Sequence, residues 1–332
     1  MSQARVLLVY SRAARFVEID RDLLGERFEV REVAATVAPP WVVLPAVARA
    51  DVVVCWFASW HALLPLLAAR LLRRPSLLIV GGFDTARVPE IGYGYQLGGP
   101  RRLLARTCMA LATRLMTNSE YSRAELRANV GRDAEVVHHG VPDLVPGSPD
   151  GPRDPLALTV SNVARIAFER KGLRPFVEAG AHAPEIEFVL VGKPLDDAAE
   201  ELQRLGAGNV RLAGRLDDEE LAALLRRAGA YVQASRHEGF GMALAEAMLA
   251  GCVPVATRAG ALPEVIGDAP AVWLDEPNPQ AIAEGVRRAV AAGPEERRRV
   301  RERILTAFPL EVRRSGLLRL VEELRAARDR RA

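Results

Sequence analysis

Two glutamates that flank a glycine-containing loop give the strongest chemical signal in the chain. Glu238 and Glu246 have seven residues between them, and the loop enters a predicted helix near Met242. Gly239 and Gly241 let the backbone bend sharply and come close to a ligand. The first N–H groups of a helix favour an anion, and carboxylates can accept hydrogen bonds from hydroxyl groups. The stretch therefore fits a ligand that carries phosphate and sugar, although the glycine pattern alone favours an ordinary strand-to-helix turn.

A second loop carries two cations after another predicted strand. Arg165 and Lys171 lie between Val163 and Gly172, ahead of a predicted helix. An arginine grips a phosphate with a planar fork, and a lysine binds it as a point charge. Alone, this loop is typical of a solvated run of charges. Together with the glycine-containing loop, it predicts a clamp for a diphosphate.

Apolar runs and helical patterns alternate along the chain and must position these loops. The runs are continuously apolar, which is typical of parallel strands that are covered on both faces. Residues 145–152 contain three prolines and two glycines, and they predict a linker. We therefore expect an α/β protein of two Rossmann-like, doubly wound domains that face each other across a cleft. The predicted strands are 5–10, 28–33, 51–56, 76–80, 114–117, 135–138, 156–163, 187–191, 210–213, 230–234 and 253–256. The predicted helices include 61–72, 100–112, 122–129, 218–228, 242–250 and 310–327.

Composition is that of an ordinary globular chain. The 332 residues carry 45 Lys and Arg against 42 Asp and Glu, and this net charge of +3 is too small to indicate nucleic-acid binding. Three separated cysteines favour a reducing compartment, and no secretory signal opens the sequence. We expect a cytoplasmic protein, at the inner face of the membrane if it contacts lipid. Residues 52–69 are long and apolar enough for a membrane span, but Pro65 within them favours a buried strand followed by a helix.

The C-terminal motifs resemble those of the family 4 retaining glycosyltransferases (glycosyl transferases group 1), which have the GT-B fold. The resemblance rests on Ser235-x-x-Glu-Gly-Phe-Gly, on Glu246-Ala-Met-x-Ala-Gly-x-x-Pro-Val, and on the spacing from Arg165 to Lys171-Gly172. It implies an acceptor-side domain over residues 1–147 and a nucleotide-sugar-binding domain over 153–308. Residues 309–332 would form a helix that packs back on the first domain.

The resemblance also implies a role for each residue of the two loops. Glu238 would hold hydroxyl groups of the donor sugar near the transferring carbon, and Glu246 would bind the ribose. Arg165 and Lys171 would stabilise the charge that develops on the leaving diphosphate. The other expected donor contacts are Gly239, Phe240, Gly241 and Met242, with Arg215 and Leu216 near the base. Transfer would retain the anomeric configuration, without a metal and without a cofactor besides the nucleotide-sugar substrate.

The N-terminal half departs from the family pattern. The family commonly has a histidine after the fourth strand, where this chain has Gly81-Gly82-Phe83-Asp84. We expect Asp84 to serve there as the catalytic polar group, with Gly81 and Gly82 making room for substrate; a turn or cap residue is an equal alternative. His139 is a further acceptor-side candidate, and a histidine of an interdomain loop is the competing interpretation.

The sequence thus predicts a glycosyltransferase whose acceptor is a sugar, a lipid-linked molecule or another small molecule. A GT-B phosphorylase or sugar-phosphate synthase is an alternative, as is a nucleotide-sugar-binding protein without turnover. Residues 100–111 are basic and apolar. They predict either an amphipathic helix in peripheral contact with a membrane or a helix that covers the sheet and keeps its basic face in water.

Overall fold

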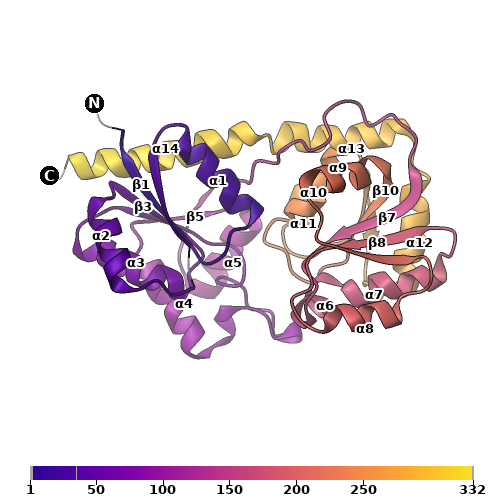
Figure 1. The fold of residues 1–332 in the computed structure, drawn as a ribbon, viewed down its shortest axis with the longest axis horizontal. Coiled ribbons are helices and arrows are strands. Elements are labelled where there is room, and N and C mark those ends of the chain that lie inside the picture. The colour runs from indigo at the N-terminus through magenta and orange to yellow at the C-terminus, as the bar shows by residue number, and fades with distance from the viewer. Residues whose placement is uncertain (1–2, 35, 331–332) are drawn as a thin grey trace. The chain divides into compact units, whose positions relative to one another are not determined.

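The computed structural model describes residues 3–34 and 36–330. These residues form two compact units (Figure 1), of which the first comprises the chain up to Gly140 together with the segment from Leu310 onward. The second unit spans Val141–Pro309. Each unit builds its own parallel sheet from alternating strands and helices, which confirms the predicted fold class. The functions assigned to the two domains from the sequence stay predictions.

Six strands form the sheet of the first unit. They are β1 (Arg5–Tyr10), β2 (Glu29–Ala34), β3 (Val52–Trp56), β4 (Ser76–Ile79), β5 (Arg114–Thr117) and β6 (Glu135–Val136). Their order in the sheet is β2-β1-β3-β4-β5-β6, with every neighbouring pair parallel. All residues of β3 and β4 are buried, since helices cover both faces of the sheet.

The helices of the first unit form two layers. They are α1 (Arg15–Gly25), α2 (Pro40–Arg49), α3 (Trp60–Leu71), α4 (Gly99–Leu111), α5 (Glu120–Val130) and α14 (Leu310–Asp329). Side chains of α2, α3, α4 and α5 pack in one apolar cluster, and those of α1 and α14 pack in another on the opposite face. The stretch 100–111 is therefore a helix that covers the sheet, with Leu104 and Met109 buried.

A buried ion pair holds α14 on the first unit. Arg313 donates to both carboxylate oxygens of Asp20, at 2.8 and 2.7 Å, and to the backbone carbonyl of Val137 at 2.8 Å. Asp20 also accepts the indole N–H of Trp56 at 3.0 Å. Both charged side chains of the pair are fully buried. Helices α1 and α14 and strand β3 therefore meet at a single carboxylate.

The second unit repeats the scheme with a different strand order. Its strands are β7 (Asp154–Val160), β8 (Glu187–Val191), β9 (Val210–Gly214), β10 (Ala228–Gln233), β11 (Val253–Thr257) and β12 (Val272–Leu274). Its helices are α6 (Arg165–Lys171), α7 (Leu173–Glu178), α8 (Ala198–Leu205), α9 (Asp218–Arg227), α10 (Met242–Leu249), α11 (Leu262–Ile266), α12 (Pro279–Val290) and α13 (Pro294–Ala307). The strand order is β12-β11-β10-β7-β8-β9.

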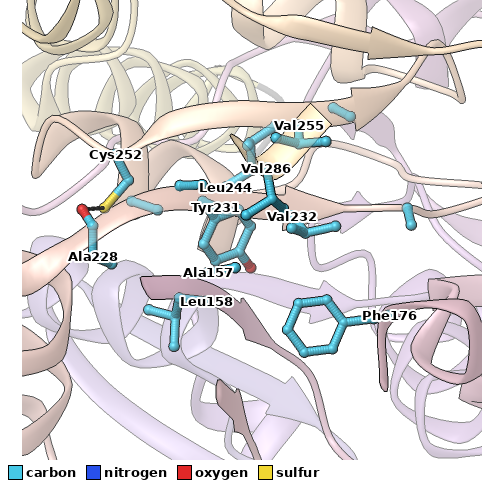
Figure 2. Close-up of a cluster of buried hydrophobic side chains, with 14 of the residues drawn as sticks. Ala157, Leu158, Phe176, Ala228, Tyr231, Val232, Leu244, Cys252, Val255 and Val286 are labelled. Carbon is cyan, nitrogen blue, oxygen red and sulfur yellow. Dashed lines mark hydrogen bonds between the residues drawn. The ribbon is translucent and has the colours of Figure 1, made fainter. Parts of the chain in front are cut away.

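The core of the second unit is continuous along these central strands. Figure 2 shows Tyr231 of β10 among apolar side chains that include Leu158 of β7. The Tyr231 hydroxyl accepts the N–H of Val160 at 3.2 Å, and burial raises the pKa of this phenol far above its ordinary value. The three cysteines of the chain are buried and free, and Cys252 donates to the carbonyl of Ala228 (Figure 2). This packing fixes the carboxyl ends of β7 and β10.

The structure contains elements that the sequence patterns did not predict. Helices α1 and α2 lie in a stretch where no helix was predicted from the sequence, and α2 contains two prolines. Pro40 is at the first position of α2, where a missing N–H costs nothing. Helix α9 begins with a capping box, because Asp217 and Glu220 exchange both hydrogen bonds. Among the described residues, no helix combines the length and the apolar character that crossing a bilayer requires.

Candidate functional site

The strand order of the second unit reverses between β7 and β10. The chain runs from β7 outward to β8 and β9, and it then returns to β10 on the other side of β7. In doubly wound sheets, ligands bind outside the carboxyl ends of the strands at such a switch point. The segment expected to be the first loop is largely helix α6, which follows β7 and ends in Lys171, and the loop that contains Glu238 follows β10. The topology therefore brings the two predicted loops to one place.

Glu238 is the centre of a buried polar cluster at this point. Its Oε1 accepts hydrogen bonds from the ammonium of Lys171, from the amide of Gln233 at 2.8 Å and from the hydroxyl of Ser235 at 3.0 Å. Gln233 also donates to the Ser235 hydroxyl at 2.7 Å. The side chain of Glu238 is 8% exposed and that of Lys171 is 19% exposed. The carboxylate is thus held in one position by donors from β10 and from the end of α6.

Burial and charge have opposite effects on Glu238. Burial alone raises the pKa of its carboxyl, but the charges of Lys171 and Arg170 and the hydrogen bonds from Lys171 and Ser235 outweigh it, so the pKa of Glu238 is lowered. Burial lowers the pKa of Lys171, and the neighbouring carboxylate opposes this effect. Glu238 is therefore ionised at neutral pH and can accept hydrogen bonds from hydroxyl groups. A protonated Lys171 has three donors, of which Glu238 uses one.

Two glycines allow the loops to approach each other closely. Gly172, with φ of +64°, ends α6, and a Cβ there would lie 2.2 Å from the carbonyl oxygen of Ala234. Gly260, with φ of +62°, packs so tightly on Glu238 that a Cβ would lie 2.0 Å from its carbonyl oxygen. The N–H of Ala261 donates to that same oxygen at 2.9 Å. Backbone contacts thus position both Lys171 and Glu238.

Helix α10 follows directly from the Glu238 loop. Gly241 is its N-cap residue, with φ of +99° and no side-chain cap, and Met242 is its first residue. The early N–H groups of such a helix carry a partial positive charge. Glu246 lies one turn further along α10 and is buried, and Phe240 is buried against the ring of Phe308 at 5.2 Å between ring centres. The expected roles of Gly239, Phe240, Gly241, Met242 and Glu246 stay predictions.

The guanidinium of Arg165 is not part of the Lys171–Glu238 cluster. It donates to Asp197 at 2.7 and 2.9 Å and to Glu201 at 2.8 Å, at the start of α8. Its side chain is 55% exposed, and these carboxylates raise its already high pKa. Because ion pairs in water are weak, this contact can be exchanged for another anion. Arg215 and Leu216 follow β9, where Arg215 is exposed and Leu216 is half-buried against the core.

In the first unit, Asp84 is engaged with the backbone. Its Oδ1 accepts the N–H groups of Gly81, Gly82 and Thr85 at 3.0–3.2 Å, and its Oδ2 accepts the N–H of Ala58 at 2.9 Å. Burial raises the pKa of Asp84, although the hydrogen bonds from the N–H groups of Ala58, Gly81 and Gly82 lower it. The side chain is fully buried. This geometry supports the turn-residue interpretation, in which Asp84 ties together the loops after β3 and β4.

Gly81 and His139 lie close to one another through Asn118. A Cβ on Gly81, whose φ is +138°, would lie 2.7 Å from Oδ1 of Asn118. The Nδ2 of Asn118 is 3.0 Å from Nε2 of His139, and the imidazole stacks on Trp56 at 5.8 Å between ring centres. Burial lowers the pKa of His139 well below its ordinary value, so the ring is neutral. A Cβ on Gly82 would instead lie 3.3 Å from the ring of Phe57.

Sequence reasoning did not single out Gln233, Gly260 or the anchoring role of Ser235. Gln233 is a buried amide at the end of an apolar strand, which is a signal that could have identified it. Gly260 carries no signal of its own, because its closeness to Glu238 arises only in the folded chain. Within residues 3–34 and 36–330, no group of three or more His, Cys, Asp and Glu residues is arranged to hold a metal ion.

One family model matches most of the second unit. Residues 154–305 match the model of the family described as Glycosyl transferases group 1. The matched segment begins at β7 and ends in α13, so it includes Lys171, Glu238 and Glu246.

Curated relatives match parts of the chain. The MMP alpha-(1->4)-mannosyltransferase of Mycolicibacterium hassiacum is 37% identical over 123 residues, which cover 36% of this chain and 26% of that protein. The phosphatidyl-myo-inositol mannosyltransferase of Mycolicibacterium smegmatis is 30% identical over 180 residues, which cover 50% of this chain and 45% of that protein. The chain therefore spans less than half the length of these relatives.

Solved structures match nearly the whole chain at low identity. The sucrose-phosphate synthase of Thermosynechococcus elongatus superposes with a TM-score of 0.76 at 18% identity, over 98% of this chain and 100% of that one. The Anabaena protein Alr3699/HepE, solved with UDP and glucose, gives a TM-score of 0.76 at 17% identity, over 96% of this chain and 99% of that one. These matches show that the fold is GT-B.

Proposed function

Since residues 154–305 form a domain of the Glycosyl transferases group 1 family, we propose that this chain is a glycosyltransferase. It transfers a sugar from a nucleotide-diphosphate sugar to an acceptor, with retention of the anomeric configuration and without a metal ion. The observation that carries the proposal is the contact between Lys171 and Glu238 at the switch point of the second sheet. This contact places a cation and a fixed carboxylate where a doubly wound domain binds its ligand.

The two charges match the two ends of the bond that must break. When the bond between the anomeric carbon and the diphosphate oxygen breaks, negative charge develops on the diphosphate and positive charge on the sugar ring. The free N–H donors of Lys171 and the first N–H groups of α10 stabilise the diphosphate, since preplaced donors act best where charge develops. Arg165 supplies a second cation once the diphosphate replaces Asp197 and Glu201.

Glu238 acts on the sugar side of the same bond. Its ionised carboxylate accepts hydrogen bonds from sugar hydroxyl groups and so orients the ring, because Gln233 and Ser235 hold it from behind. An acceptor oxygen then attacks the face that the diphosphate leaves, and its proton passes to the departing phosphate oxygen. Attack on that face retains the anomeric configuration. Glu246 binds the ribose, and Arg215 with Leu216 lies near the base.

The test is a transfer assay with GDP-mannose and UDP-glucose, offered with lipid-linked and free sugar acceptors. Proton NMR of the product reports the anomeric configuration, and the assay is repeated with EDTA. We expect one donor to be consumed, an α-linked product from an α-linked donor, and no loss of rate with EDTA. An inverted product or a loss of activity with EDTA contradicts the mechanism, and binding of a donor without transfer contradicts the assignment as an enzyme.

A further inference from the structure

The outward faces of α2 and α3 are apolar, where surface helices are usually polar. On α2, Trp41 is 78% exposed and Leu44 is 44% exposed. On α3, Trp60, Leu67 and Leu71 are 51%, 41% and 74% exposed, and their spacing places them along one face of the helix. The opposite face of each helix is buried against the sheet. The two helices pack against each other and lie side by side in Figure 1, so their exposed residues form one apolar surface.

This surface has basic residues and no acidic residue on its helices. The segments 40–49 and 60–71 contain Arg49 and Arg70 but no Asp or Glu. The neighbouring helix α4, over residues 99–111, likewise contains arginines and no acid. Arg73 and Arg74 follow α3 after its C-cap residue, Leu72. The surface therefore combines large apolar side chains with an unbalanced positive charge.

Arg73 occupies a backbone position that normally takes glycine. Its φ is +52°, just after α3 ends, and the N–H of Arg74 returns to the carbonyl of Ala69 at 2.8 Å. This is the closing bond of a helix end at which glycine is the usual residue, because a side chain is strained there. An arginine in this position gains no ion pair among the described residues. Strain of this kind is typical of positions that are kept for binding.

Arg70 and Arg73 line a groove of about 850 Å³ at the end of α3. The groove also contains Arg74, Arg114 and Arg328, beside the apolar side chains of Leu72 and Leu324. Arg114 is paired with Glu323, and Arg328 with Asp51. Within the part of the chain that the structure describes, neither Arg70 nor Arg73 has a carboxylate within 4.0 Å. Two cations are therefore left to bind an external anion next to the apolar surface.

We propose that the α2–α3 surface docks on an anionic lipid bilayer. Trp41 and Trp60 fit the depth of the headgroups, where amphipathic rings are favoured, and Leu44, Leu67 and Leu71 reach the first part of the acyl chains. Arg49, Arg70 and Arg73 bind lipid phosphates. A second copy of this chain fits the surface poorly, because two basic surfaces repel each other. The proposal does not rest on the transfer of a sugar.

Co-sedimentation of the full chain with vesicles tests the proposal. We expect binding to vesicles of phosphatidylcholine mixed with phosphatidylglycerol, weak binding to phosphatidylcholine alone, and weaker binding at high salt. The double variant Arg70→Ser/Arg73→Gly should bind about tenfold less tightly, since each cation near the surface contributes. Arg73→Gly also relieves the left-handed strain, so the fold is kept. The variant Trp41→Ser/Leu71→Ser should lose binding to both kinds of vesicle.

A matched control lies on α13, where Leu305 is 42% exposed and Arg299 is exposed. The variant Leu305→Ser/Arg299→Ser should bind vesicles as the parent chain does. Tryptophan emission gives a second readout, because Trp41 and Trp60 should shift to the blue on binding and Trp56 is already buried. Equal binding by all variants overturns the proposal. So does a dimer, measured without lipid, that the Trp41→Ser/Leu71→Ser variant converts to monomer.

Discussion

The ammonium of Lys171 donates to Oε1 of Glu238, although 67 residues separate the two in the chain. The contact forms because β7 and β10 are neighbours in the sheet, so that the loops following them lie together. The carboxylate needs the cation to stay ionised while buried, and the cation needs the carboxylate to stay oriented. Mutation of each residue should therefore have its own measurable effect, on kcat for Lys171 and on the free energy of unfolding for Glu238.

Removal of the cation should affect turnover more than donor binding. Lys171→Ala should lower kcat about 10²- to 10³-fold, the cost of losing one preplaced donor to a developing negative charge. Steady-state kinetics with the nucleotide sugar that the transfer assay selects measures this effect. The matched control is Arg288→Ala on the exposed side of α12, which removes one positive charge elsewhere and should leave kcat unchanged. An equal fall in both variants would show that net charge, and not position, matters.

Neutralising Glu238 should destabilise the second unit. Glu238→Gln keeps the shape of the side chain but leaves a buried Lys171 without its counter-charge, so the free energy of unfolding should fall by about 3 kcal/mol. Denaturant unfolding at neutral pH measures the change. An unchanged midpoint would mean that Lys171 turns to water at no cost.

The same pair should make stability depend on pH on the acidic side. Because the pKa of Glu238 is lowered in the folded chain, the unfolded chain binds more protons between that lowered pKa and the ordinary value of 4.5. Its contribution is thus complete above pH 4.5 and is lost as the pH falls through the lowered pKa. Unfolding curves measured at several pH values in this window should show that the free energy of unfolding changes less with pH in Glu238→Gln than in the parent chain. An identical pH dependence in the two proteins would show that Glu238 does not contribute to stability in this way.

Asp84 should prove to be a structural residue of the first unit. In Asp84→Asn, the amide NH₂ faces the N–H of Ala58, or else the three N–H groups bound by Oδ1, so at least one buried donor is left unsatisfied. The free energy of unfolding should fall by about 1–3 kcal/mol. The affinity for the nucleotide-sugar donor should stay the same, because we propose that this substrate binds the second unit. A large fall in kcat with unchanged stability would instead support the catalytic role expected from the sequence.

The buried pair of Arg313 and Asp20 should anchor α14 far more strongly than exposed pairs do. Arg313→Met leaves Asp20 as an unpaired buried charge and should cost about 3–5 kcal/mol of unfolding free energy. Arg314→Met is the neighbouring control, since Arg314 pairs with Glu26 at the surface. Its effect should fall within the small range typical of surface pairs. Similar losses in the two variants would contradict the anchoring role.

Much of the fold can be predicted from the sequence, because strands that are buried on both faces appear as continuous apolar runs. Val52–Trp56 and Ser76–Ile79 are such runs, and both are strands buried on two faces. Helix α2 was missed because its outer face is apolar too and carries prolines, which removes the usual amphipathic pattern. The same exposed apolar residues of α2 form part of the surface that we propose for membrane docking.

The site was only partly predictable for a related reason. Lys171 and Glu238 could be paired in advance, since each follows a strand and carboxyl ends of parallel strands share an edge. The partners of Arg165 could not, because Asp197 and Glu201 are 32 and 36 residues away on a different loop and helix. Arg165 can pair either with those two acids or with a diphosphate, and the local sequence around Arg165 does not determine which contact forms.

Calorimetric titration of UDP, GDP and ADP into the parent chain, Lys171→Ala and Arg288→Ala shows whether Lys171 binds the diphosphate of the donor. We expect one nucleotide diphosphate to bind the parent and Arg288→Ala equally, and to bind Lys171→Ala at least about tenfold more weakly. Equal affinity of that nucleotide for the parent and for Lys171→Ala, or no binding of any of the three to the parent, would contradict this expectation.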